Sequence, residues 1–362
     1  MKSSSTVRGG GLLCLRPSTS SAVGRVPFIG SMPFRSALFG GQCAYSSSHA
    51  GPVVGPEWVK QHMGRVTLVD ATWSLKKPEK PHKVQIPGAV YFDIDDIADK
   101  TTQLPHMLPT PEFFEQKMNQ LGIHHNDDLL IYDNSNGQFV ASARVWWTFR
   151  VYGHRGKISV LEGGFQNWPQ DVDISSSSSA FVNRSASSSS PYKADFHPEL
   201  VVDCNYVANL AKTNIQLHQQ QTDKTTKEKE LFMLKEAKNE EERAQILDAR
   251  PKGRFEGKEP EPRPGIPSGH IPYSISLPHT DLFHPSFSAS SSSFLKLKPK
   301  EELVELLVKD KGVDLTKPII TSCGSGVTAS VLALALETLG KSARVFDGSW
   351  TEYASRKDTP KQ

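Results

Sequence analysis

A cysteine followed by a short glycine-containing loop is the feature of this sequence that could most directly do chemistry. Cys323 comes directly after an apolar run, and Gly324 and Gly326 follow it before a helical pattern begins. Glycines let successive backbone N–H groups turn inward and cradle an anion, and the N-terminus of a helix adds the positive end of its dipole. A thiolate held in this way is a nucleophile. The pattern therefore predicts a reactive cysteine instead of a buried structural one.

The side chains of this loop argue against phosphate chemistry. Cysteine phosphatases also place a cysteine before an anion-binding loop and a helix, but they need an arginine six positions later to hold phosphate. That position is Ala329 here. The five residues after the cysteine are all uncharged: Gly324, Ser325, Gly326, Val327 and Thr328. Because nothing charged is present to hold a phosphoryl group, we set the phosphatase interpretation aside.

The other cysteines do not suggest a site. Cys14 and Cys43 lie in an N-terminal segment of unusual composition, and Cys204 precedes a helical pattern without nearby glycines. Two remaining cysteines, Cys204 and Cys323, are too few for a disulfide framework and badly spaced for zinc. We expect Cys204 in the core, and no metal.

The chain carries one set of motifs twice, at offsets between 178 and 190 residues. Each copy alternates short Val/Ile/Leu runs with longer helical patterns, which is typical of an α/β fold with a parallel sheet and helices on both faces. Four segments match in the same order, so we predict two copies of one domain. The paired segments are 66–72 with 245–250, 86–93 with 269–276, 129–133 with 318–323, and 160–168 with 345–353.

Composition divides the chain of 362 residues into four parts. The first 56 residues contain no Asp or Glu, but they contain five Lys and Arg among many Ser and Gly, as organelle transit peptides do. Without these five residues the formal net charge of +3 becomes about −2, so charge does not indicate a nucleic-acid partner. Serine runs predict a flexible linker between the copies. We expect a transit segment over 1–50, an N-terminal domain over 53–172, a linker over 173–199 and a C-terminal domain over 200–358.

Several motifs together resemble the tandem rhodanese family, in particular its 3-mercaptopyruvate sulfurtransferase branch. They are the loop 323–328, the motif Gly348-Ser349-Trp350 and the segment 248–255, with further likeness at 105–109 and 143–147. The resemblance extends from about Val53 to Asp358. It implies two rhodanese-like domains, of which the C-terminal one is catalytic.

The resemblance also implies that the first domain is inactive. Asp133 stands at the position that matches Cys323, and a carboxylate cannot carry a transferable sulfur. The implied enzyme is a sulfurtransferase that carries sulfur as a persulfide on Cys323. Ser325 is then the second catalytic residue, which relays a proton to the leaving group or donates a hydrogen bond.

The uncharged loop bears on the choice of sulfur donor. Relatives that use thiosulfate have basic residues where this chain has Gly324 and Ser325, so the resemblance implies 3-mercaptopyruvate as donor, with thiosulfate used less well. Arg254 and Arg263 match the family's clamp for the donor carboxylate, a task that suits the fork of the guanidinium group. The rest of the expected substrate-binding set is Gly324, Gly326, Val327 and Thr328.

One position departs from the family pattern. Many relatives have a histidine before the Ile-Pro-Gly motif of the first domain, where this chain has Gln85. Glutamine is no base at neutral pH, so either the proton relay is dispensable or His82 or water replaces it. His270 is expected to be structural.

The resemblance implies partners and a location. We expect a small-molecule sulfur donor, thioredoxin or a small thiol (or cyanide) as acceptor, release of pyruvate, no cofactor, no nucleic acid and no membrane. The expected location is the mitochondrial matrix, and an additional cytoplasmic form stays open. Two alternatives also stay open: a persulfide relay protein for tRNA thiolation, and a rhodanese that prefers thiosulfate. Cys323 disfavours a non-catalytic docking module.

Overall fold

The computed structural model describes residues 51–75, 83, 86–172, 191–221, 244–287 and 293–362. The predicted transit segment, Gln85, His82 and part of the predicted linker lie outside these residues. Both copies of the repeat belong to one compact unit, His49–Gln362.

The first copy is built on a five-stranded parallel sheet with the order β1-β5-β4-β2-β3. Its strands are β1 (Val53–Val54), β2 (Thr67–Asp70), β3 (Val90–Tyr91), β4 (Leu129–Tyr132) and β5 (Ile158–Leu161). Its helices are α1 (Pro56–His62), α2 (Pro111–Leu121), α3 (Val140–Val151) and the 3-10 turn η1 (Gly164–Asn167).

The second copy has a five-stranded parallel sheet with the matching order β6-β12-β11-β7-β8. Its strands are β6 (Val201–Val202), β7 (Gln245–Asp248), β8 (Ile275–Ser276), β11 (Ile319–Ser322) and β12 (Arg344–Phe346). Its helices and turns are η2 (Pro198–Leu200), α5 (Cys204–Gln221), α7 (Lys252–Phe255), η4 (His279–Leu282), α8 (Lys300–Val304), the π-helical turn η5 (Glu305–Asp310), α9 (Val327–Thr338) and α10 (Ser349–Ser355). The identical strand order confirms the predicted repeat of one α/β domain.

Alternate residues of each central strand pack into different helical layers, because side chains of a strand point to opposite faces in turn. In β4, Leu129 and Ile131 pack with α2 and α3, while Leu130 packs on the side of α1. In β11, Ile319 packs with α9, while Ile320 packs with α5 and α10. Helices therefore cover both faces of both sheets, as predicted.

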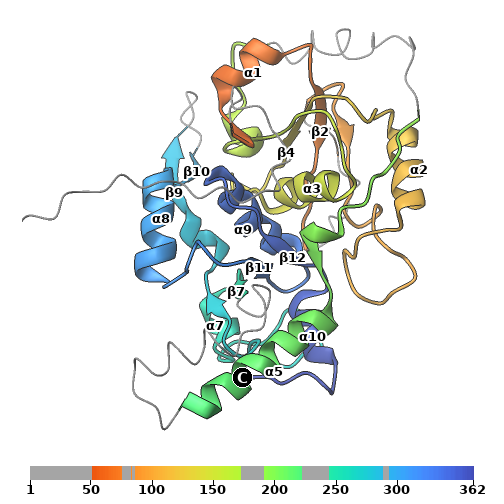
Figure 1. Ribbon diagram of the computed structural model, residues 1–362. Helices are drawn as coiled ribbons and strands as arrows, with labels where there is room; N and C mark the ends of the chain where they lie inside the picture. Colours follow the sequence, from red (N-terminus) through yellow and green to blue (C-terminus); the bar gives the residue numbers. More distant parts are fainter. Residues whose placement is uncertain (1–50, 76–82, 84–85, 173–190, 222–243, 288–292) are drawn as a thin grey trace, which may run out of the picture. The chain divides into compact units, whose positions relative to one another are not determined.

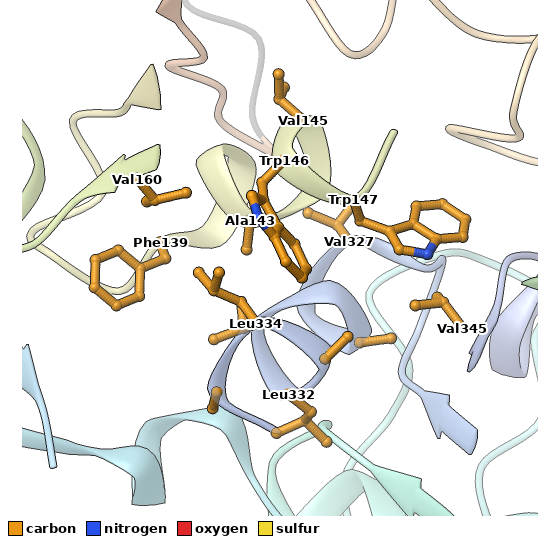
Figure 2. Close-up of a cluster of buried hydrophobic side chains, with 14 of the residues drawn as sticks. Phe139, Ala143, Val145, Trp146, Trp147, Val160, Val327, Leu332, Leu334 and Val345 are labelled. Carbon is orange, nitrogen blue, oxygen red and sulfur yellow. The ribbon is translucent and has the colours of Figure 1, made fainter. Parts of the chain in front are cut away.

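The two copies meet where α3 packs against α9 (Figure 1). Figure 2 shows Trp146 and Trp147 of the first copy in one buried cluster with Val327, Leu334 and Val345 of the second. Burying a large apolar side chain contributes about 1.5–3 kcal/mol, so this cluster stabilises the interface between the copies strongly. It also explains why α9 is apolar nearly all round: one side faces its own sheet and another faces α3.

A two-stranded antiparallel hairpin is present in the second copy and has no counterpart among the described residues of the first. Its strands are β9 (Phe283–Phe287) and β10 (Ser293–Leu297). The N–H of Leu295 donates to the carbonyl of Asn136 at 3.0 Å, and Lys296 pairs with Glu162 at 3.3 Å. The hairpin is thereby attached to the first copy beside its loop 133–139.

The end of the predicted linker is attached to the first copy. Tyr192 is fully buried, and its N–H donates to the side chain of Asn119 at 2.8 Å. The N–H of Asp195 and that of His197 donate to carbonyls of α3 and the residue after it. This part of segment 173–199 therefore lies against α2 and α3, because it supplies an aromatic side chain to their core. In the described part of the chain, no helix combines the length and apolar character that spanning a membrane requires.

Candidate active site

The Cys323 loop (residues 323–328) connects the end of β11 to the start of α9 at the carboxyl edge of the second sheet. Cys323 is 2% exposed. Gly326 is the N-cap of α9 with a φ of +79°. A Cβ at this position would lie 2.6 Å from the carbonyl oxygen of Asp347, so only glycine fits the loop here.

The loop leaves backbone donors available for an anion. In the described part of the chain, the N–H groups of Gly324, Ser325, Val327 and Thr328 donate to no other residue. The first N–H groups of any helix lack intrahelical partners and favour negative charge. Uncharged side chains and free N–H groups next to Cys323 suit a thiolate or a persulfide.

Ser349 binds the backbone of the Cys323 loop. Its hydroxyl oxygen accepts the N–H of Cys323 and that of Gly326, both at 3.1 Å, and its O–H donates to the carbonyl of Phe346 at 2.7 Å. Ser349 has a φ of +50°, in the left-handed region that side-chain-bearing residues rarely adopt. The strained turn places one hydroxyl within hydrogen-bonding distance of both Cys323 and Gly326. Sequence reasoning used this serine as part of a motif but gave it no role.

Arg263 is the predicted clamp residue that the structure brings to the loop. Its Nη2 donates to the Ser325 hydroxyl at 3.3 Å, and its Nη1 would lie 3.9 Å from a Cβ on Gly324. Burial lowers the pKa of Arg263, while the negative charge of Cys323 opposes that effect. The guanidinium therefore lies within electrostatic reach of the cysteine sulfur.

Arg254, the other predicted clamp residue, has no hydrogen bond to the loop among the described residues. It pairs with Glu261 at 3.4 Å, and its positive charge helps to lower the pKa of Arg263. The same Glu261 pairs with Arg250 at 2.7 Å. Arg250 is fully buried and binds Asp248 at 2.6 Å, so its role is structural. Glu261 thus bridges the buried Arg250 and the half-buried Arg254.

His106 comes from the first copy and reaches the same place. Its Nε2 accepts from Arg263 Nη2 at 3.4 Å, which leaves its proton on Nδ1. That Nδ1 lies 3.0 Å from Asp95 Oδ1, a close contact that is not aligned as a hydrogen bond. Sequence reasoning quoted His106 only within a motif and looked for a histidine near Gln85. The available signal was the position of His106 between Pro105 and Pro109. In the structure His106 adopts a φ of +62°.

A second residue of the first copy, Arg144, also contacts the loop. It is 3% exposed and pairs with Asp347, Nη1 to Oδ1 at 2.7 Å. The same Nη1 lies 3.4 Å from the carbonyl of Gly326, and Nη2 donates to the carbonyl of His106. The sequence signal was an arginine in the middle of a mostly apolar helix.

The matching loop of the first copy contains its own anion. Asp133 is 1% exposed, and its carboxylate accepts the N–H groups of Ala141 and Ser142 at 3.1 and 2.8 Å, at the N-terminus of α3. Hydroxyls of Ser135 and Ser142 donate to it as well. The position equivalent to Cys323 thus holds a carboxylate at a helix N-terminus. A carboxylate cannot carry a transferable sulfur.

Cys204 is the other described cysteine, and it lies in the core as expected. It begins α5, is 1% exposed, and burial raises its pKa to about 12. A thiol of this kind is protonated at neutral pH and is a poor nucleophile. Within the described residues, no three His, Cys, Asp or Glu side chains are grouped as metal ligands.

Comparison with known proteins identifies the family. The family model described as "Rhodanese-like domain" matches residues 55–171 and 233–356. The chain belongs to the rhodanese-like family. As the sequence indicated, it contains two rhodanese-like domains.

Relatives with assigned activities cover most of the chain. It is 37% identical to "Thiosulfate/3-mercaptopyruvate sulfurtransferase 1, mitochondrial" of Arabidopsis thaliana, over 88% of this chain and 80% of that protein. It is 34% identical to the 3-mercaptopyruvate sulfurtransferase of Escherichia coli K12, over 85% of this chain and 96% of that protein. Among solved structures, the Tum1 protein of Saccharomyces cerevisiae matches with a TM-score of 0.63 and 31% identity, covering 85% of this chain and 96% of that one. This rhodanese-like chain is accordingly an enzyme of the sulfurtransferase class, acting on small molecules.

Proposed function

We propose that this sulfurtransferase takes sulfur from 3-mercaptopyruvate, carries it as a persulfide on Cys323 and passes it to a thiol. The observation that carries the proposal is the position of Arg263, whose guanidinium touches Ser325 and faces a loop of uncharged side chains. A donor with one carboxylate and one keto oxygen matches a single arginine fork beside neutral backbone donors. Thiosulfate, with two charges on a compact anion, would need more positive charge in the loop.

The proposed site consists of a nucleophile, a cradle and a clamp. Cys323 attacks the donor sulfur. The free N–H groups of Gly324, Ser325, Val327 and Thr328 surround the sulfur anion. Gly326 shapes this cradle, because its N–H donates to Ser349. Arg263 binds the donor beside the loop. Arg254, kept in place by Glu261, binds the carboxylate of the donor on the side away from the loop.

The first chemical step breaks the carbon–sulfur bond of the donor. The Cys323 thiolate forms a bond to the sulfur of 3-mercaptopyruvate, and the electron pair of the broken C–S bond leaves as the enolate of pyruvate. One proton added to the enolate carbon gives pyruvate, and Cys323 retains the sulfur as a persulfide. In the second step an acceptor thiolate attacks the outer sulfur, which restores the Cys323 thiolate and leaves the acceptor persulfide.

The proton for the enolate has a route through the side chains at the clamp. Arg263 cannot supply it, because a guanidinium does not deprotonate in proteins. Ser325 carries a hydroxyl proton at the loop, and His106 flanks the same Arg263 nitrogen from the first copy. We assign proton delivery to the Ser325 hydroxyl, with water restoring its proton. The His106 nitrogen at the clamp already accepts from Arg263 and has no proton to give, so we assign His106 the holding of Arg263. This assignment dispenses with a base at Gln85.

The proposed acceptor and location rest on the resemblance to the sulfurtransferase family. Thioredoxin or a small thiol such as glutathione provides the thiolate of the second step. The mitochondrial matrix is the proposed compartment, supported by the acid-free N-terminal segment and by the mitochondrial Arabidopsis relative.

Mass spectrometry of the purified protein tests the proposal. Exposure to equimolar 3-mercaptopyruvate should add one sulfur to Cys323 and none to Cys204, and should release one pyruvate. Thiosulfate at the same concentration should load Cys323 more slowly. Loading of Cys204, or transfer that persists in Cys323→Ser, would refute the assigned nucleophile. Faster loading from thiosulfate would instead favour a thiosulfate rhodanese.

A further inference from the structure

Arg144 joins three chain segments that must cooperate at the active site, although it belongs to the copy without a cysteine. Its guanidinium contacts the Gly326 carbonyl of the Cys323 loop, the carboxylate of Asp347 and the carbonyl of His106. The side chain is almost completely buried, and its guanidinium lies 4.6 Å from the ring centroid of Trp147. One cation thus lies where the loop, the turn below it and the His106 segment meet.

Asp347 completes this connection from the second copy. Its Oδ2 accepts the N–H of Leu108 at 2.8 Å while its Oδ1 faces Arg144. It also directly precedes the Gly348-Ser349 turn, whose hydroxyl holds the Cys323 loop. The segment 106–108 of the first copy is therefore bound on both sides by the same buried ion pair.

The close approach of Arg144 requires the glycine at position 326. A Cβ there would lie 2.8 Å from Arg144 Nη1, well inside contact distance. The glycine therefore serves the loop conformation and also admits the guanidinium from the first copy.

We infer that Arg144 is a positioning residue for sulfur transfer. It keeps the His106 segment in register with the Cys323 loop, so that Arg263 can contact Ser325 and His106 together. The first copy then contributes to catalysis by alignment, through a residue that touches neither substrate nor sulfur. This inference rests on the proposed function of the Cys323 site.

The geometry of the contacts explains why the residue is arginine. Three acceptors in different segments are met by the two terminal nitrogens of one planar group, and a lysine ammonium is a single point of charge without that fork. Lysine would keep the pairing with Asp347 but could not also bind both carbonyls.

The test is the paired neutral variant Arg144→Gln/Asp347→Asn, which avoids leaving one charge buried alone. We expect kcat for 3-mercaptopyruvate to fall about 10- to 100-fold, because sub-ångström misplacement of reacting groups has effects of that size. KM should change less than about threefold, because both clamp arginines, Arg254 and Arg263, are retained and can still bind the donor. Single-turnover loading of Cys323, followed by mass spectrometry, should slow by the same factor as kcat.

The chain offers a matched control. Arg150 of α3 and Glu337 of α9 form another ion pair between the copies, at 2.7 Å, away from the Cys323 loop. Arg150→Gln/Glu337→Gln should leave kcat unchanged. Equal losses in both double variants would mean a general weakening of the interface and would overturn the inference.

The remaining outcomes separate the two proposals. If wild-type protein does not load sulfur on Cys323, the proposed function fails. If wild type loads Cys323 and the Arg144→Gln/Asp347→Asn variant loads it at the same rate, only the positioning role fails. Should that variant not fold, Arg144→Lys provides the test: a kcat loss with an unchanged melting temperature supports the role, and an unchanged kcat overturns it.

Discussion

The hydroxyl of Ser349 accepts the backbone N–H groups of Cys323 and Gly326, each at 3.1 Å, and so ties both ends of the loop to the turn after β12. Both donors are buried, and no other described residue accepts from them. The shape of the proposed sulfur cradle thus depends on one side chain that never contacts the substrate.

Ser349→Ala should therefore lower both activity and stability. Two buried donors lose their acceptor, which costs about 1–3 kcal/mol. We expect kcat to fall about tenfold or more as the loop relaxes. Steady-state kinetics and urea unfolding measure the two effects.

Two further variants isolate the hydroxyl. Ser349→Gly relieves the positive φ of +50° yet also lacks the acceptor, so it should regain some stability but not kcat. Ser159→Ala removes another buried serine hydroxyl, in β5, that has no hydrogen-bond partner among the described residues, and it should leave kcat intact. Full activity in Ser349→Ala would show that the loop keeps its shape without this acceptor.

The two clamp arginines should differ when each is replaced by alanine. Arg263 contacts Ser325 and His106, so Arg263→Ala should raise KM and lower kcat, with a loss of about 10- to 100-fold in kcat/KM. Among the described residues the Arg254 side chain pairs only with Glu261, so Arg254→Ala should raise KM and leave kcat close to wild type.

This difference is checked by kinetics with two sulfur donors: 3-mercaptopyruvate, and a mercaptoketone that lacks the carboxylate. The Arg254→Ala defect should vanish with the second donor, because its partner group is missing. Lys252→Ala, which removes a neighbouring exposed cation, serves as the control. A kcat defect in Arg254→Ala equal to that of Arg263→Ala would contradict the assigned positions.

The sequence was sufficient for the parts of the site that lie in one continuous segment. Strand, loop and helix around Cys323 follow from an apolar run, two glycines and an apolar helix, and the repeat follows from four matching segments. His106, Arg144 and Ser349 were not assigned roles, because their partners lie far away in the chain. Arg144, for example, binds Gly326, which lies 182 positions later. The contacts of Arg144 and His106 depend on how the copies pack, and those of Ser349 depend on the pairing of β11 with β12 in the second sheet. No local pattern encodes either arrangement.

The first copy should depend on Asp133 for stability and not for catalysis. Asp133→Asn keeps the size of the side chain, but its amide nitrogen can no longer accept from the donors at α3, namely Ala141 and Ser142. We expect a loss of about 1–3 kcal/mol in the free energy of unfolding, with kcat nearly unchanged.

Urea unfolding and donor kinetics test this separation. The control is Asp96→Asn, which removes a surface pairing with Lys117 that should contribute under about 1 kcal/mol. If Asp133→Asn reduced kcat as strongly as stability, the loop of the first copy would take part in sulfur transfer, contrary to the proposed division between the copies.

His154 should make the protein less stable in mild acid. Burial, aided by the neighbouring His125, lowers the pKa of His154 from 6.5 to about 4, although the carbonyl of Asp127 opposes the shift. The unfolded state therefore binds a proton as the pH falls below about 6.5, while the folded state does not until about pH 4. The contribution of His154 to the free energy of unfolding is complete above pH 6.5. It is lost as the pH falls from about 6.5 to about 4, by up to about 3 kcal/mol.

The variant His154→Gln keeps a hydrogen-bonding side chain between Asp127 and Tyr192 but cannot titrate. Its unfolding free energy, measured in urea at intervals from pH 7 to pH 4, should fall less steeply than that of wild type. His284→Gln, at an exposed histidine paired with Glu302, should follow the wild-type curve. Equal slopes for wild type and His154→Gln would mean that His154 takes up its proton in the folded state, so that the buried ring between Asp127 and Tyr192 is open to water.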